Sequence, residues 1–226
     1  METLIIKKTT LEDISDCIRF FDGDQNYTIN EIPDKIRQLA QQINTNKEFT
    51  CQLIERTNPN IVIPDSITSI GAYAFENYAS LQSIVIPNSI TSIGTAAFAG
   101  CTSLTSITIP DSVTAIGISI FSGCTNLESV NFSSGMTSIR SNTFEGCISL
   151  TSIIIPNNIV SIEDRAFMGC AGLTSVTLPN NITSMGYWAF SECQNLTTIN
   201  VPWAEGTVSG APWGATNATI NYNYTG

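Results

Sequence analysis

Residues 87–109 read PNSITSIGTAAFAGCTSLTSITI, and this stretch decides the fold because it recurs along the chain without insertion or deletion. Its phenylalanine, its leucine and its cysteine each return at every 23rd position. Such a fixed period predicts a solenoid, in which each coil stacks its apolar residues on those of the next coil. The three columns are Phe75, Phe98, Phe121, Phe144, Phe167 and Phe190; Leu81, Leu104, Leu127, Leu150, Leu173 and Leu196; and Cys101, Cys124, Cys147, Cys170 and Cys193.

Each copy predicts three sides around one core. Ile107 and Ile109 alternate with polar residues, which predicts a strand with its isoleucines turned inward. A shorter extended segment is expected to end at Gly94, and Phe98 and Cys101 are expected on one side of a helical turn. Together these sides predict an α/β solenoid.

The fourth copy departs most from the pattern. Ser133 stands in place of the proline, Arg140 in place of the glycine, and Phe132 at the end of the preceding strand. We expect the stack to bend or loosen at this copy.

The chain divides into four parts. The apolar spacing of residues 1–45 predicts a helical hairpin, an anchor or oligomerisation element. Residues 46–60 are predicted to be a linker or N-terminal cap, and residues 61–203 to be the solenoid with six repeats. Residues 204–226, rich in glycine and aromatic residues, are predicted to cap the last open coil.

The charge and composition exclude several classes of function. With a formal net charge of −10, the chain is a poor partner for nucleic acid or an anionic membrane surface. It contains no histidine, the commonest general base and metal ligand. The apolar run 4–6 is too short for a signal peptide, and no apolar window is long enough to cross a membrane. We expect neither membrane insertion nor a leader.

The repeat I-P-x-S-[IV]-T-x-I-G-x-x-[AI]-F-x-G-C-x-x-L-x-S-[IV]-x-I-P resembles that of the BspA-like leucine-rich repeat family of bacterial and protist surface proteins. The resemblance covers about two thirds of the chain. It implies a leucine-rich repeat solenoid that binds a partner and has no shared catalytic residues.

The two ends resemble a second group, the tail-associated proteins of gut bacteriophages and prophages. Near the start, the resemblance rests on Ile14-Ser-Asp-Cys-Ile-Arg19, Gly23 and Glu31-Ile-Pro-Asp-Lys-Ile-Arg37. Phe21-Asp22 departs from the lysine-threonine of that pattern. At the other end, the resemblance rests on Pro202-Trp-Ala-Glu-Gly and on the segment from Gly210 to Tyr224. It implies a virion protein of the phage tail.

No enzyme is expected. The column from Cys101 to Cys193 could suggest a metal or disulfide site, but equivalent side chains in stacked coils point the same way. We therefore expect buried free thiols, with no metal and no cofactor.

Glu163 and Asp164 form a single local acidic pair, and no lysine follows Lys47 to activate the many serines.

The outward columns of the predicted strand remain as the candidate binding surface. A flat, hydroxyl-rich surface could hold a glycan or peptide, and two aromatic residues could stack on a sugar. The alternative is that serine and threonine are simply well-solvated strand residues. The candidates are Thr105, Thr108, Asn131, Thr151, Thr174, Thr177, Thr197, Asn200, Tyr187 and Trp188.

Two functions compete. The first is a tail-associated structural protein that recognises a bacterial surface glycan or protein receptor, contacts other tail proteins and forms homo-oligomers through residues 1–45. The second is a cell-surface adhesin of the BspA-like family, located on the cell surface or outside the cell. A weaker third option is a scaffold for protein partners.

Overall fold

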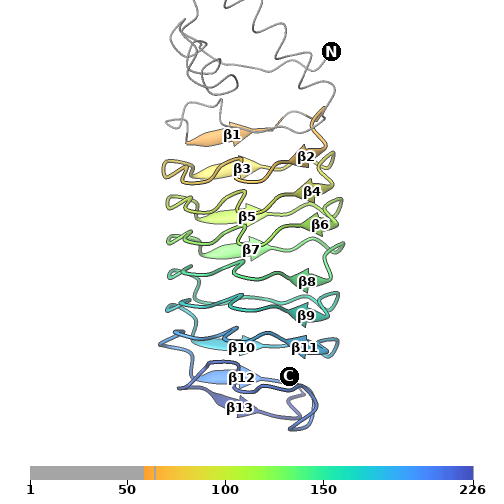
Figure 1. The fold of residues 1–226 in the computed structure, drawn as a ribbon, viewed down its shortest axis with the longest axis vertical. Helices are drawn as coiled ribbons and strands as arrows, with labels where there is room; N and C mark the ends of the chain where they lie inside the picture. Colours follow the sequence, from red (N-terminus) through yellow and green to blue (C-terminus); the bar gives the residue numbers. More distant parts are fainter. Residues whose placement is uncertain (1–58, 64, 226) are drawn as a thin grey trace, which may run out of the picture.

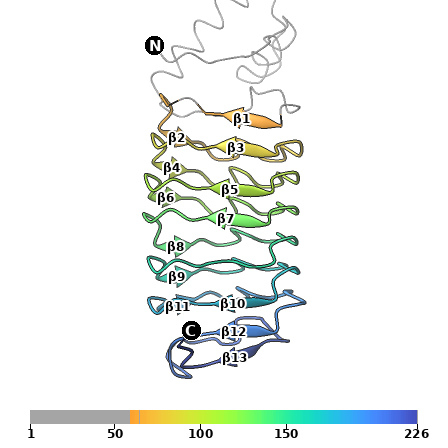
Figure 2. The ribbon, with the colours of Figure 1, turned by 180° about the vertical axis from the view of Figure 1, so that it is seen from behind.

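The protein is a straight stack of coils, seen from two opposite sides in Figures 1 and 2 of the computed structural model. The structure describes residues 59–63 and 65–225. Strands of three residues run along one side of the stack and strands of two residues along the other. The long strands are β1 (Asn60–Val62), β3 (Ser83–Val85), β5 (Ser106–Thr108), β7 (Ser129–Asn131), β10 (Ser175–Thr177), β12 (Thr198–Asn200) and β13 (Thr219–Asn221). The short strands are β2 (Ser69–Ile70), β4 (Ser92–Ile93), β6 (Ala115–Ile116), β8 (Ser138–Ile139), β9 (Ser161–Ile162) and β11 (Ser184–Met185).

Most neighbouring strands pair in parallel, and paired residues lie one sequence period apart until the last pair. Ile107 of β5 faces Val130 of β7, for example, and Ile93 of β4 faces Ile116 of β6. The sequence period is therefore the period of the coils. We number them coil 1 to coil 6, beginning at residues 64, 87, 110, 133, 156 and 179.

The third side of each coil corrects the α/β prediction. The described residues contain no helix, so none of them forms a helix able to cross a membrane. The segment around the phenylalanine is a series of turns, and the fold is a β-solenoid. Alternate amides of this segment bond to the next coil, and those between them close tight turns within the coil, as Glu76 does to Tyr73. Between coils 1 and 2 these bonds run from Tyr73 to Thr95, from Phe75 to Ala97 and from Asn77 to Ala99.

Left-handed residues explain why these turns are not helical. Each of the six coils holds a residue with φ of 53–61° two positions before the phenylalanine, and such a residue interrupts a right-handed helix. A second left-handed residue, such as Gly100 with φ of 70°, lies two positions after it. We call the first set the corner column. It contains Tyr73, Ala96, Ser119, Asn142, Arg165 and Trp188.

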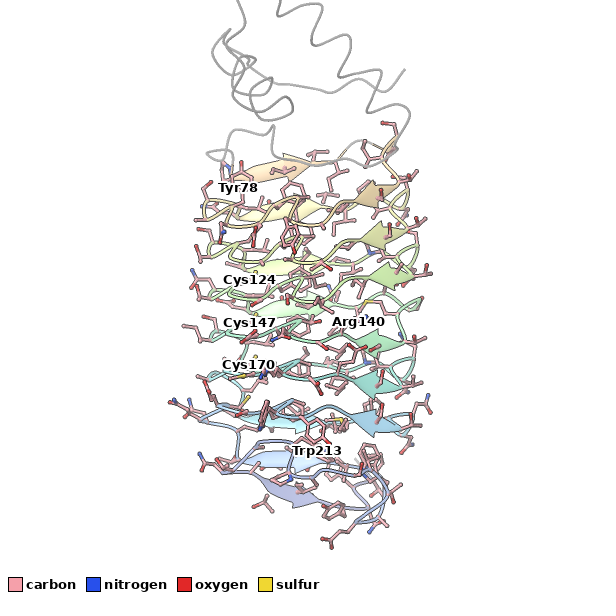
Figure 3. All side chains as sticks on the ribbon, in the orientation of Figure 1. Tyr78, Cys124, Arg140, Cys147, Cys170 and Trp213 are labelled. Atoms are coloured by element: carbon pink, nitrogen blue, oxygen red, sulfur yellow. The ribbon has the colours of Figure 1, made fainter. Side chains whose placement is uncertain are left out.

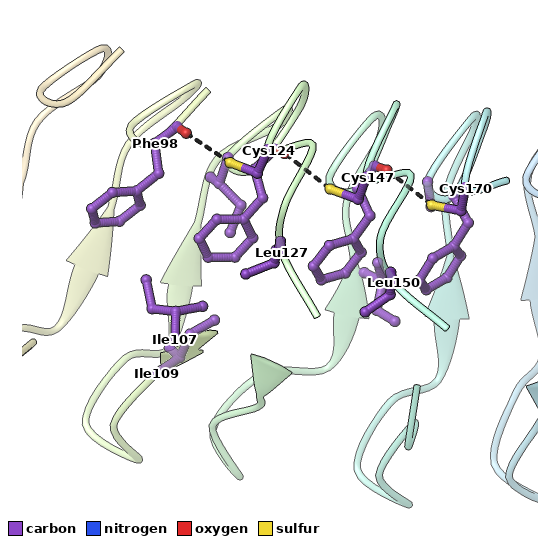
Figure 4. Packing of buried hydrophobic residues seen from close by; sticks show 14 of the residues in the cluster. Phe98, Ile107, Ile109, Cys124, Leu127, Cys147, Leu150 and Cys170 are labelled. Carbon is purple, nitrogen blue, oxygen red and sulfur yellow. Dashed lines mark hydrogen bonds between the residues drawn. The ribbon is translucent and has the colours of Figure 1, made fainter. Parts of the chain in front are cut away.

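The core consists of the predicted columns. The phenylalanine rings form one continuous stack, with centroids of successive rings 5.1–5.7 Å apart and planes within 18° of parallel. The leucines are fully buried beside them, and Figure 4 shows both columns with the isoleucines of the long strands. Rings at this separation gain packing energy beyond the area that they bury. Because no coil can bury its own apolar face alone, each depends on its neighbours.

Both strand sides are interrupted between coils 3 and 4, where the sequence predicts a looser stack; on the long-strand side β3 and β5, of coils 1 and 2, are not paired either. On the short-strand side β2, β4 and β6 form one sheet and β8, β9 and β11 form another. On the other side β7 ends a sheet, and coil 4 contributes only one isolated bridge, from Ile154 to Thr177. The turn side continues across this boundary, since Ser119, Phe121 and Gly123 donate to coil 4 at 2.7–3.0 Å.

Arg140 lies at the interrupted position. In the other coils the corresponding amide bonds to the preceding coil, as Gly117 does to the Ile93 carbonyl at 2.8 Å. Arg140 forms no such bond within residues 65–225. A Cβ at Gly117 would collide with the backbone of Thr95, which shows how closely the coils approach here. Glu163 also replaces glycine but keeps its bond, so we attribute the interruption to Arg140 together with the other changes of coil 4.

The C-terminal segment continues the sheet although the repeat pattern has ended. β13 pairs with β12, but the offset between partners is shorter than the repeat period, as the pairing of Ile199 with Ile220 shows. Trp213 is buried one full period after Phe190, and its indole N–H donates to the Ser209 carbonyl at 2.9 Å. Figure 3 shows Trp213 inside the end of the stack. The predicted hairpin of residues 1–45, and residues 46–58 of the predicted linker, lie outside the described residues.

Candidate binding surface

The long strands carry two outward columns in register, which together form what we call the strand face. Along each strand the middle residue is buried or half-buried and the flanking residues turn outward. Stacked strands lie about 4.8 Å apart, so each column offers one side chain at each such step. One column is made of the exposed residue that precedes each long strand from β3 to β12, or its equivalent in coil 4, and the other of the last residue of each strand, or its equivalent in coil 4. The first contains Gln82, Thr105, Glu128, Thr151, Thr174 and Thr197, and the second contains Val62, Val85, Thr108, Asn131, Ile154, Thr177, Asn200 and Asn221.

Hydrogen bonds between coils hold the polar side chains of the second column in place. The Asn131 amide donates to the Thr108 hydroxyl at 3.1 Å, and Asn200 donates to Thr177 at 3.2 Å. Asn221 extends the same row by donating to Asn200 at 2.8 Å. A ligand that binds here meets side chains that are already ordered, which lowers the entropic cost of binding.

The apolar members of the strand face are the part that sequence reasoning undervalued. Ile154 is 87% exposed, Val62 77% and Val85 65%. The repeat places Val85 and Ile154 in the outward column, although they are not among the candidate binding residues. The strand face therefore offers hydrogen-bonding groups with isolated apolar contacts between them.

The structure separates the ten predicted residues into two groups. Eight lie on the strand face: all are exposed except Asn200, which is half-buried. Tyr187 and Trp188 do not join them, because they directly follow β11 on the short-strand side of the stack (Figure 1). The two groups therefore belong to two different surfaces.

The cysteine column is interior. All five side chains are buried free thiols, and each donates its S–H to a phenylalanine carbonyl of the preceding coil, as Cys124 does to Phe98 at 3.1 Å (Figures 3 and 4). Burial raises the pKa of Cys101 from 9.0 to about 12 and that of Cys193 to about 11. The pKa values of the thiols between them are also raised, again chiefly by burial. Because the thiolate is the reactive form, these thiols are suited to packing.

The acidic pair of coil 5 has structural partners. Glu163 lies 3.2 Å from the Arg140 guanidinium and accepts hydrogen bonds from Ser138 and Ser141. Asp164 accepts the amide N–H of Tyr187 at 2.8 Å. Within the described part of the chain, no three histidine, cysteine or acidic residues are grouped so as to hold a metal ion.

Comparison with known proteins identifies the repeat. The model for the BspA type leucine rich repeat region matches residues 50–153 and 137–209, which is more than half of the chain. No curated protein sequence is significantly similar to this chain.

Several solved structures are similar. One is described as a leucine rich cell surface protein from Faecalibacterium prausnitzii, with 31% identity over 67% of this chain and a TM-score of 0.55. A leucine-rich repeat protein from Eubacterium ventriosum has 31% identity over 75% of the chain and a TM-score of 0.61. A third, from Bacteroides ovatus, has 26% identity over 76% and a TM-score of 0.55. The chain spans about half the length of these proteins, namely 50%, 44% and 56%.

Proposed function

We propose that this chain, which belongs to the BspA-type leucine-rich repeat family, is a non-enzymatic binding protein that presents its strand face to a receptor on a bacterial surface. The observation that carries the proposal is the register of the two outward columns. Equivalent side chains from successive coils line up into a flat, largely neutral surface. The binding residues would be Thr105, Thr108, Asn131, Thr151, Thr174, Thr177, Thr197 and Asn200.

The receptor would be a surface glycan or protein of a bacterium. Rows of hydroxyl and amide groups suit hydrogen bonding to sugar hydroxyls or to an extended peptide. The exposed side chain of Ile154 adds an apolar contact in the middle of the strand face. The formal net charge of −10 argues against nucleic acid as the partner.

As the setting of this function we propose a phage or prophage tail. The proposal rests on the sequences of the two ends, where residues 14–37 and 202–224 resemble tail-associated proteins. Residues 1–45 would anchor the protein to other tail proteins or join copies of it, and residues 204–226 would cap the solenoid. The burial of Trp213 supports the capping role.

A bacterial adhesin is the second candidate, and a specific observation favours it. The similar protein from Faecalibacterium prausnitzii is described as a cell surface protein. An adhesin would use the same strand face but would be displayed by the cell that makes it. Identifying neighbouring genes for tail and lysis proteins would favour the phage setting.

The test is binding of the full chain to intact gut bacteria, run beside a glycan array. The variant Thr105→Lys/Thr151→Lys/Thr174→Lys places three charged side chains on the strand face, and all three positions are exposed. We expect at least a ten-fold loss of binding. The matched control is Thr91→Lys/Thr137→Lys/Thr183→Lys, which makes the same change at exposed threonines on the short-strand side.

If the control weakens binding and the first variant does not, the strand face is the wrong surface. If the wild-type chain binds neither cells nor glycans, the proposed function itself is wrong.

A further inference from the structure

The corner after β11 is a second exposed surface with a chemistry of its own. Tyr187 is 79% exposed and Trp188 is 55% exposed, side by side in the sequence at the turn that follows the short strand. Adjacent large aromatic residues are costly to expose to water, and in soluble proteins such residues often mark binding sites.

The backbone does not require an aromatic residue there. Trp188 belongs to the corner column, with φ of 57°, a conformation that disfavours bulky side chains. Ala96, Ser119 and Asn142 hold the same conformation in other coils. The fold therefore determines the backbone at this position and leaves the side chain free, and coil 6 carries a large aromatic residue where smaller ones are accepted.

A cation lies against the indole. The guanidinium carbon of Arg165, the corner-column residue of the preceding coil, is 5.0 Å from the centre of the Trp188 ring. Beyond residue 59 the sequence has only two cationic side chains, Arg140 and Arg165. Arg140 is paired with Glu163, whereas Arg165 has no carboxylate within ion-pair distance among the described residues. Its guanidinium is thus available as a hydrogen-bond donor.

The corner is held rigid by bonds between the two coils. The Arg165 amide donates to the Tyr187 carbonyl at 3.0 Å, and the Tyr187 amide donates to Oδ1 of Asp164 at 2.8 Å. Asp164 is exposed, and its second carboxylate oxygen accepts no hydrogen bond from residues 65–225. An acceptor and a donor therefore stand next to each other in the sequence, beside an aromatic surface.

The corner is also open toward the end of the stack. Each earlier member of the corner column donates its amide to the next coil, as Asn142 does to Asp164 at 3.0 Å. The Trp188 amide makes no such bond in the described part of the chain. One more backbone donor of the corner is therefore left without a partner among the described residues.

We propose that Trp188, Tyr187, Arg165 and Asp164 form a binding site for a neutral hexopyranose unit of a bacterial surface glycan. The aromatic rings would pack against the C–H face of the sugar. A sugar hydroxyl both accepts and donates, so a vicinal pair of hydroxyls matches the Arg165 guanidinium and the free oxygen of Asp164. A uronic or sialic acid fits less well, because the Asp164 carboxylate and the acidic chain would repel its charge.

This inference rests on the proposed recognition of bacterial surfaces, although it places the sugar outside the strand face. The experiment uses the full chain on an array of neutral glucose, galactose and mannose oligosaccharides, beside uronic-acid oligosaccharides of equal length. The strongest neutral ligand is then titrated against the chain, with isothermal titration calorimetry as the readout, which does not depend on the tryptophan that one variant removes.

The test variants keep the backbone conformation. Asparagine tolerates the left-handed region and stands at residue 142 of the same column, so Trp188→Asn and Arg165→Asn remove the side chain without straining the turn. Tyr73→Asn is the matched control. Tyr73 is an exposed aromatic residue of the same column, and because it belongs to coil 1 it is the first member of that column. Thermal unfolding of all three variants checks that they fold.

We expect Trp188→Asn and Arg165→Asn each to weaken binding of the neutral glycan by at least about ten-fold, and Tyr73→Asn to leave it unchanged. A preference for acidic glycans, or equal binding by wild type and Trp188→Asn, overturns the proposed site. If wild type binds cells and Trp188→Asn binds them equally well, this site is wrong while the proposed function stands. If wild type binds no cells but binds the neutral glycan through Trp188, only the proposed function fails.

Discussion

The boundary between coils 3 and 4 has a continuous side and an interrupted side. On the turn side, the phenylalanine stack passes unbroken through Phe121 and Phe144, at 5.7 Å between ring centroids and 18° between ring planes, the upper end of the range in the stack. On the two strand sides the sheets stop. Ser133 stands where the other coils have proline, and Arg140 stands where all other coils except coil 5 have glycine. One boundary thus combines an unbroken stack of core rings with interrupted sheets.

The difference shows which interactions join the coils. Phe144, Cys147 and Leu150 are fully buried, so a change in any of them would disturb three coils at once. The changed strand side is compensated locally: the buried Ser133 hydroxyl donates to the Val113 carbonyl at 2.8 Å, and Arg140 pairs with Glu163. A stack that is coupled between nearest neighbours tolerates loss of both strand ladders at one boundary when the turn side still crosses it.

Breaking the continuous side should have the largest effect. Phe144→Ala removes a ring that stacks on Phe121 and Phe167 and meets Phe132 edge-on at 5.9 Å. We expect the free energy of unfolding in urea to fall by about 3–5 kcal/mol. Val130→Ala, on the partly buried strand side of the same boundary, is the control and should cost less than about 2 kcal/mol. Equal losses would mean that the turn side does not dominate.

Raising the pH tests the turn side a second way. The folded pKa of Cys101 is raised from 9.0 to about 12, so the unfolded chain releases its proton first as the pH rises. The stability that this thiol contributes is complete below pH 9 and is lost progressively between about pH 9 and 12. At pH 10.5 the loss should be about 2 kcal/mol relative to pH 8.

The measurement is urea unfolding at both pH values for wild type and for Cys101→Ala. The variant should be less stable at pH 8 but should lose about 2 kcal/mol less on going to pH 10.5. Since tyrosines and lysines are common to both proteins, their titration cancels in the comparison. Parallel pH dependence of the two proteins would contradict a raised Cys101 pKa.

Changing the interrupted side should have the smallest effect. Arg140→Gly restores the glycine of the regular coils and removes the ion pair with Glu163. In that pair the Arg140 side chain is 46% exposed and the Glu163 side chain 31% exposed. We expect the free energy of unfolding to change by less than about 1 kcal/mol, because a solvated ion pair contributes little. Unfolding in urea at low and at high salt would measure it. A loss clearly beyond that range would make Arg140 an essential joint between the coils.

Sequence periodicity predicted the core well and the backbone of the turns poorly. The alternation of Ile107 and Ile109 with polar residues identified the long strand correctly, because burial follows directly from a period of two. The short apolar group around Phe98 suggested a helical turn, but its spacing is equally compatible with a turn whose amides bond to another coil. The left-handed residue in that group is Ala96, a good helix former that gives no local signal.

Of the two candidate surfaces, one could be predicted from the sequence and the other could not. The outward columns of the strand face followed from the repeat, since equivalent positions of stacked coils must align. The repeat did not predict that Tyr187 and Trp188 lie away from that face. It also did not predict that Trp188 contacts Arg165. These depend on how the chain turns after β11, which a local pattern does not specify.

By itself the sequence determined the period, the buried columns and the family, because burial of one apolar residue in each coil repeats with the coil. Only the tertiary structure decided that the turns are not helices, that β13 continues the sheet, and that a tryptophan and an arginine from successive coils meet at one corner. The physical reason is that these features depend on hydrogen bonds and contacts between coils. Their partners are distant in the sequence, and the exposed positions where they meet accept almost any side chain.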